Sequence, residues 1–268
     1  MWTLMGKLVG IRELRRLTVV FGLSSAVQGV ALALMIPFAW LALRVVEGVG
    51  IGALSSVEGR LRWGLLARAL ALALLALSPS IITSVVSIGL DGGIPAEALS
   101  KAPLLIPILL VLVPLQASAE EYVFRGLALR TLMGWGLAPL LAAVIAVVPF
   151  TLGHIYGWKG LLDVTVFGLA MGWLIVRTRG LEAAIALHVV NNLTAAVFAV
   201  LGGGNPLDDS DIPLWALAVS IAMTLAYTFI ADRLWGPART PFDHGDEGGA
   251  ATRESEAAAP AAMRDAPL

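Results

Sequence analysis

Residues 102–126, APLLIPILLVLVPLQASAEEYVFRG, join a long uncharged run to a cluster of ionisable side chains. Residues 102–119 carry no charge, Glu120 and Glu121 follow them, and Arg125 comes four positions after the second glutamate. An apolar run of this length is typical of a helix that spans a membrane. Ionised groups in or beside hydrocarbon are costly, so they mark a functional site by default. The stretch therefore predicts a membrane helix that carries a reactive site.

The composition of the whole chain also indicates a membrane protein. Of its 268 residues, 58% are hydrophobic and 14% are charged, and the mean hydropathy is +0.86. The net charge of −1 gives no reason to expect a nucleic-acid partner. The absence of cysteine excludes disulfides, thiolate metal ligands and a cysteine nucleophile. We predict an all-α, polytopic transmembrane helical bundle of about seven to eight spans that encloses an intramembrane catalytic cavity.

Apolar runs and charged connections divide the chain. We expect an interfacial amphipathic helix over residues 1–16. The expected spans are 17–43, 69–90, 102–131, 139–154, 161–176, 183–201 and 212–231. Residues 1–235 are assigned to an integral membrane domain with its motif core at 102–201, and residues 236–268 to a disordered tail. Arginine-rich connections alternate with acidic ones, which predicts that the arginine side and the tail are cytoplasmic.

Helical spacing assigns different tasks to the charged residues. Glu121 and Arg125 are four positions apart and are expected to form an ion pair. Glu120 lies about 100° further round the helix and is left free for chemistry. Of three histidines, His154 and His188 lie in other apolar runs. At about 1.5 Å per residue, both are expected at a depth similar to that of Glu120, around one cavity.

Supporting residues are expected around this set. His188 and Asn192 share a helical face because they are four residues apart, and Asn191 is read as a packing or supporting amide. Tyr122 is read as an interfacial anchor. Gly168 and Gly172, at small-xxx-small spacing, predict close helix packing.

Three motifs occur in order: Glu-Glu-x-x-x-Arg, Phe-x-x-x-His and His-x-x-x-Asn. They resemble those of the CPBP intramembrane proteases, which include the type II CAAX prenyl endopeptidases and relatives linked to bacteriocin immunity. The resemblance covers roughly residues 102–201. It implies that Glu120, helped by His154, activates a water that attacks a peptide carbonyl, while His188 and Asn192 stabilise the oxyanion. Glu121 and Arg125 would hold the motif helix.

The resemblance implies a peptidase that acts on a membrane-embedded or lipidated peptide, including prenylated CAAX-type substrates, within the lipid bilayer of a bacterial plasma membrane. Zn²⁺ is an open alternative, because Glu120, His154 and His188 could hold it and leave a position for water. The resemblance leaves a metal-free glutamate mechanism open as well, and because the familiar His-Glu-x-x-His zinc spacing is absent, spacing alone does not decide between the two. The rival interpretation is a non-catalytic transporter, immunity or scaffold protein whose buried Glu and His relay protons or bind a partner. The sequence leaves the oligomeric state open.

Overall fold

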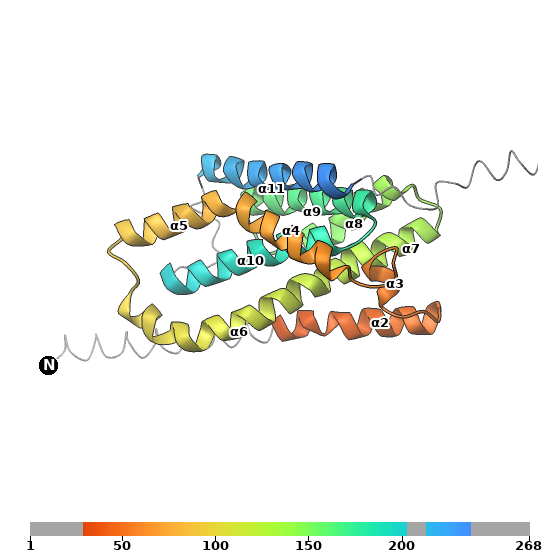
Figure 1. The fold of residues 1–268 in the computed structure, drawn as a ribbon, viewed down its shortest axis with the longest axis horizontal. Coiled ribbons are helices and arrows are strands. Elements are labelled where there is room, and N and C mark those ends of the chain that lie inside the picture. Colours follow the sequence, from red (N-terminus) through yellow and green to blue (C-terminus); the bar gives the residue numbers. More distant parts are fainter. Residues whose placement is uncertain (1–28, 203–212, 237–268) are drawn as a thin grey trace, which may run out of the picture. The chain divides into compact units, whose positions relative to one another are not determined.

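The computed structural model describes residues 29–202 and 213–236, and the regular elements within these ranges are all helices (Figure 1). They are α2 (Met35–Val46), α3 (Gly52–Ser55), α4 (Trp63–Ala76), α5 (Ser78–Leu90), α6 (Ala96–Glu120), η1 (Glu121–Ala128), α7 (Leu129–Gly134), α8 (Pro139–Leu152), α9 (Trp158–Thr178), α10 (Glu182–Gly202) and α11 (Leu214–Trp235). The chain divides into two units, 1–236 and 237–268, and the described residues belong to the first. The expected helix over 1–16, the start of the first expected span and the expected disordered tail fall outside the described residues.

The helical, polytopic membrane character is confirmed, but the span count of about seven to eight is not. Five stretches among the described residues are long and apolar enough to cross a membrane. They are Gly29–Val46, Ala96–Gly134, Trp158–Thr178, Glu182–Gly202 and Leu214–Trp235. Helices α4 and α5 make a sixth if the pair, bent by 50°, is one span. Helix α8 has only 14 residues, or about 21 Å at 1.5 Å per residue, against a hydrocarbon core of about 30 Å.

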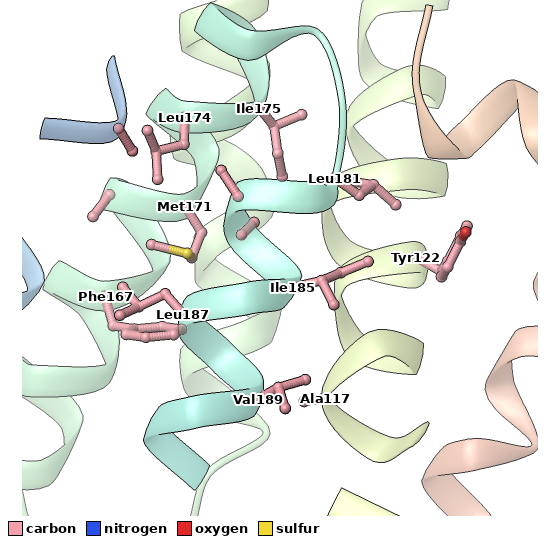
Figure 2. Close-up of a cluster of buried hydrophobic side chains, with 14 of the residues drawn as sticks. Ala117, Tyr122, Phe167, Met171, Leu174, Ile175, Leu181, Ile185, Leu187 and Val189 are labelled. Carbon is pink, nitrogen blue, oxygen red and sulfur yellow. The ribbon is translucent and has the colours of Figure 1, made fainter. Parts of the chain in front are cut away.

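Helix α10 supplies the centre of the buried core. It packs against α4 and α6 and also contacts α9, which in turn packs against α8 and α11. In Figure 2, Val189 of α10 lies beside Ala117 of α6, and Leu187 lies beside Phe167 of α9. Alanines with no exposed surface, among them Ala183 on α10, let these helices approach closely. The core therefore fixes the position of α10 relative to α6 and α9.

Small residues also join α8 to α9, as the sequence predicted. A Cβ atom added to Gly172 would lie 3.0 Å from the Cβ of Ala143, and one added to Gly168 would lie 3.1 Å from Val147. Larger side chains at these positions would push the two helices apart, because backbones this close leave no room for them.

The longest helical stretch changes its winding at the glutamate pair. Residues Ala96–Gly134 form one continuous helical stretch, but Glu121–Ala128 adopt a π-helix. A π-turn bonds residue i to i+5 and occurs frequently at functional sites. Four residues of this segment are buried: Glu121, Tyr122, Arg125 and Gly126. The wider turn thus brings the charged motif and its neighbours to the inside of the protein.

The connection between α2 and α4 crosses over to the turn between α9 and α10. Ser56 forms an isolated antiparallel bridge with Gly180, and the guanidinium of Arg62 binds the Glu182 carboxylate at 2.7 Å. A Cβ atom at Gly180 would collide with both of those charged groups, so this close approach requires glycine. Arg177 pairs with Asp232 at 2.7 Å near the same turn. Connections that carry arginine are therefore gathered at one end of the helices, as the alternating charge pattern predicted.

Candidate active site

Four ionisable side chains are buried together where the end of α6, η1 and α10 meet. The exposed fractions are 6% for Glu120, 0% for Glu121, 3% for Arg125 and 3% for His188. Arg125 Nη1 donates to Glu121 Oε1 at 3.2 Å, which is the ion pair expected from the sequence. His188 Nδ1 approaches the same oxygen at 2.7 Å. Because an ionised carboxylate only accepts hydrogen bonds, Nδ1 carries the proton in this contact.

Glu120 is held at one oxygen and left open at the other. Its Oε1 accepts a hydrogen bond from Gln116 Nε2 at 2.5 Å. Its Oε2 lies 3.6 Å from His188 Nε2 and has no hydrogen-bond partner in the described part of the chain, although it is buried. At this separation the two atoms do not form a hydrogen bond with each other. They are close enough for one small polar group to contact both.

Asn192 joins the site through the side-chain amide of Gln116, a residue that was not among the expected site residues. Asn192 Nδ2 lies 3.5 Å from Gln116 Oε1, and Asn191 Nδ2 donates to Asn192 Oδ1 at 3.2 Å. Gln116 could have been found, because it is the one strongly polar side chain in an uncharged run and stands four residues before Glu120. The asparagine and the glutamate therefore meet through Gln116.

His154 lies close to this cluster, but not inside a span as predicted. Helix α8 ends at Leu152, so His154 sits in the following turn and is partly buried. Its Nδ1 contacts the Phe150 carbonyl oxygen at 2.8 Å. A carbonyl only accepts, so Nδ1 donates in this contact and Nε2 is the ring nitrogen that the contact leaves available. The reason for the difference is that α8 is too short to carry His154.

One aromatic ring connects the two histidines and the arginine. The ring centroid of Phe150 lies 4.9 Å from that of His154 and 6.2 Å from that of His188. The guanidinium carbon of Arg125 lies 3.8 Å from the same centroid, a distance typical of a cation–π contact. The phenylalanine of the second motif therefore positions the charged groups of the first and third motifs.

Metal binding at this site stays a prediction. Within residues 29–202 and 213–236, no group of three His, Cys, Asp or Glu side chains is arranged to hold a metal ion. Glu120, His154 and His188 are therefore not arranged to hold one ion together.

An apolar pocket of about 380 Å³ lies next to the site. It is formed by η1, α7 and α8, and its lining includes Val123, Leu127 and Pro149. On η1, the pocket residues Val123 and Leu127 lie two positions after Glu121 and Arg125, so the pocket is on a different face of η1 from this ion pair. Glu120, His154 and His188 do not line it. The expected catalytic cavity around those three residues therefore also stays a prediction.

Comparisons with known proteins find a family match over the segment that carries this cluster. Residues 102–194 match the family model described as Type II CAAX prenyl endopeptidase Rce1-like. An uncharacterized protein of Bacillus subtilis (strain 168), YyaK, is 29% identical over 146 residues, which are 49% of this chain and 48% of that protein. The match thus spans about half the length of that curated relative. No solved structure matches the chain. The matched range contains every motif residue named above, and over that range this chain is similar to the Rce1-like family.

Proposed function

We propose that this protein is an intramembrane endopeptidase that hydrolyses a peptide bond of a membrane-embedded or lipidated substrate, including prenylated CAAX-type peptides. One observation carries the proposal: in an Rce1-like segment, a buried Glu120 directs an unpartnered Oε2 toward Nε2 of His188, 3.6 Å away. A buried polar atom without a partner is unusual and calls for an explanation. A reacting water held between these two atoms supplies one.

The charges of the cluster favour a protonated His188. Glu120, Glu121 and Arg125 together carry one net negative charge when all three are ionised, and an uncompensated buried charge is costly. A proton on both nitrogens of His188 makes the cluster neutral. Nδ1–H then donates to Glu121 Oε1, and Nε2–H is directed toward Glu120 Oε2. The resting site therefore holds a carboxylate base beside a cationic donor.

These groups support a balanced hydrolysis. Glu120 Oε2 accepts a proton from water while the water oxygen forms its bond to the peptide carbonyl carbon. The resulting oxyanion accepts hydrogen bonds from His188 Nε2–H and from Asn192 Nδ2–H. The proton on Glu120 then passes to the leaving nitrogen as the carbon–nitrogen bond breaks, which restores the carboxylate. His154, whose Nε2 the contact with Phe150 leaves available, orients the water.

The remaining motif residues hold these groups in place. Glu121 fixes the orientation of the His188 ring through Nδ1, and Arg125 balances the charge of Glu121 while it rests on Phe150. The arginine-rich end of the helices is proposed to face the cytoplasm of a bacterial cell. A substrate embedded in the membrane would then be cut within the lipid layer.

The test is Glu120→Gln in purified protein reconstituted into liposomes with a membrane-anchored reporter peptide. Cleavage should fall by roughly 10²–10⁴-fold, the usual contribution of a positioned general base. The thermal midpoint should change little, because glutamine keeps the shape of the side chain and its oxygen can still accept the hydrogen bond from Gln116. Glu97→Gln is the matched control, since that glutamate is exposed and pairs with Lys101 at the opposite end of α6 from Glu120.

Two results would contradict the proposal. Full cleavage by Glu120→Gln would remove the glutamate from the chemistry. Proton-coupled solute uptake by wild-type liposomes, with no peptide cleavage, would favour the rival transporter, which also uses buried carboxylates and histidines.

A further inference from the structure

The hydrogen bonds around Gln116 have a defined direction. An ionised Glu120 can only accept, so Gln116 must present its NH₂ group to Oε1. The carbonyl of the same amide then faces Asn192, which must present its own NH₂ group. The carbonyl of Asn192 in turn faces the NH₂ group of Asn191. The charge on one carboxylate therefore sets the orientation of three successive amides.

These amides form a chain between two helices. Gln116 belongs to α6, whereas Asn191 and Asn192 belong to α10. All three side chains are partly buried among apolar residues. Hydrogen bonds that run head to tail in a medium of low dielectric constant polarise one another. Every donor in this chain points along it toward Glu120, so the chain acts on that carboxylate as a unit.

Resting on the proposed hydrolysis, we propose that Gln116 is a positioning residue of the active site and that Asn191 supports it through Asn192. Gln116 holds Oε1 of Glu120 and thereby keeps Oε2 directed at His188 Nε2. It also occupies one N–H of Asn192, and the second N–H remains for the oxyanion. A single amide thus aligns the base and one oxyanion donor with each other.

The kinetic test compares Gln116→Met, Asn191→Ala and the double variant on the reporter peptide. Methionine keeps the length of glutamine but forms no comparable hydrogen bonds. Loss of a hydrogen bond to a charged group should lower kcat about tenfold, with KM within about twofold because substrate binding is untouched. Asn191→Ala should lower kcat less. Leu115→Met, an exposed neighbour on the same helix, is the matched control and should retain the wild-type kcat.

The double variant separates a relay from two independent structural effects. Gln116→Met already disconnects Asn191 from Glu120, so adding Asn191→Ala should cause no further loss of kcat. If the two losses of kcat multiply in the double variant, the proposed chain of hydrogen bonds from Asn191 to Glu120 is wrong. Wild-type kcat in Gln116→Met would overturn the positioning role while leaving the proposed hydrolysis intact. A wild-type protein that cleaves no peptide would refute the hydrolysis itself, and the positioning role with it.

A second measurement examines the chain in the folded protein without relying on turnover. The sequence has two glutamines, Gln28 and Gln116. Selective ¹⁵N labelling of glutamine side chains therefore gives two NH₂ signal pairs, which Gln116→Met assigns. The Gln116 pair should lie away from the position of a solvated amide and should move in Asn192→Leu and in Glu120→Leu, while the Gln28 pair stays unchanged. A Gln116 pair that matches a solvated amide and ignores both substitutions would overturn the proposal.

Discussion

Two buried glutamates of this protein differ in how completely their oxygens are paired. Glu182 has no exposed surface, and Glu120 is 6% exposed. Both oxygens of Glu182 are occupied by Arg62: Oε1 accepts from the backbone N–H at 2.8 Å and from Nε at 3.1 Å, and Oε2 accepts from Nη2 at 2.7 Å. Glu120 Oε2 has no hydrogen-bond partner in the described part of the chain, and neither has Oε2 of the adjacent Glu121.

The difference separates a structural carboxylate, Glu182, from Glu120, the carboxylate that we propose to be reactive. A buried ion pair whose hydrogen bonds are all formed holds two segments together and leaves no polar atom free to bind a substrate. The Glu182–Arg62 pair closes the α2–α4 connection onto the turn at Gly180. The cluster at Glu120 contains buried carboxylate oxygens without hydrogen-bond partners. This arrangement is expected of a site whose hydrogen bonds are completed only when water and substrate bind.

The largest predicted effect breaks the complete pair. Glu182→Ala should destabilise the protein by about 3 kcal/mol, because it leaves the charge of Arg62 largely buried and unpaired. The thermal midpoint in detergent should fall clearly. Glu120→Gln should change it little. Equal losses of stability in the two variants would erase the distinction between the two glutamates.

Replacing both partners of that pair sharpens the comparison. Arg62→Leu combined with Glu182→Leu removes both charges and should recover much of the stability lost in Glu182→Ala. A double variant that is as unstable as the single one would show that the pair is needed for more than charge compensation.

A smaller effect is expected where the α2–α4 connection touches the motif helix. Tyr122 is 7% exposed and shares a hydrogen bond of 2.7 Å with Ser55, so the expectation that it anchors the protein at the membrane interface is wrong. Tyr122→Phe should lower stability by about 1 kcal/mol. Peptide cleavage should fall only modestly, since Glu120 and His188 keep their contacts.

Ser55→Ala is the matched variant for this contact. It leaves the tyrosine hydroxyl buried without its partner, so it should cost at least as much stability as Tyr122→Phe. Loss of cleavage equal to that of Glu120→Gln in either variant would mean that the connection belongs to the reacting groups rather than to their support.

The smallest effect belongs to an exposed pair at the same end. Arg130 Nη2 lies 2.6 Å from Glu47 Oε2, and its hydrogen bond holds the pKa of Glu47 below the usual range. The folded state therefore binds the proton less readily than the unfolded state does. The pair contributes fully above the ordinary pKa of a glutamate and loses its contribution as pH falls through the lowered folded value.

This pH dependence can be measured by comparing wild type with Glu47→Gln. The wild-type thermal midpoint should be slightly higher at neutral pH, and the difference should vanish in acid. It should also shrink in high salt, because exposed ion pairs are screened. A difference that persists unchanged in acid would assign the effect to packing instead.

Contacts along one helix were predictable, and contacts between helices were not. The Glu121–Arg125 pair follows from a spacing of four, which places both side chains on one face whatever surrounds them. His188 was expected to approach Glu120 but also binds Glu121, because the rotation of α10 about its axis is set by core packing. The Arg62–Glu182 pair joins residues 120 positions apart, and no spacing rule connects them.

The sequence by itself determined that this is a helical membrane protein, which residues form the three motifs, and that the matched segment resembles one protease family. Hydrophobic runs and residue identity carry that information locally, so it can be read without coordinates. The tertiary structure alone decided that α8 stops short of His154, that the helix widens at Glu121, and that amides join α6 to α10. These outcomes depend on how separate helices pack, and packing balances many distant contacts at once.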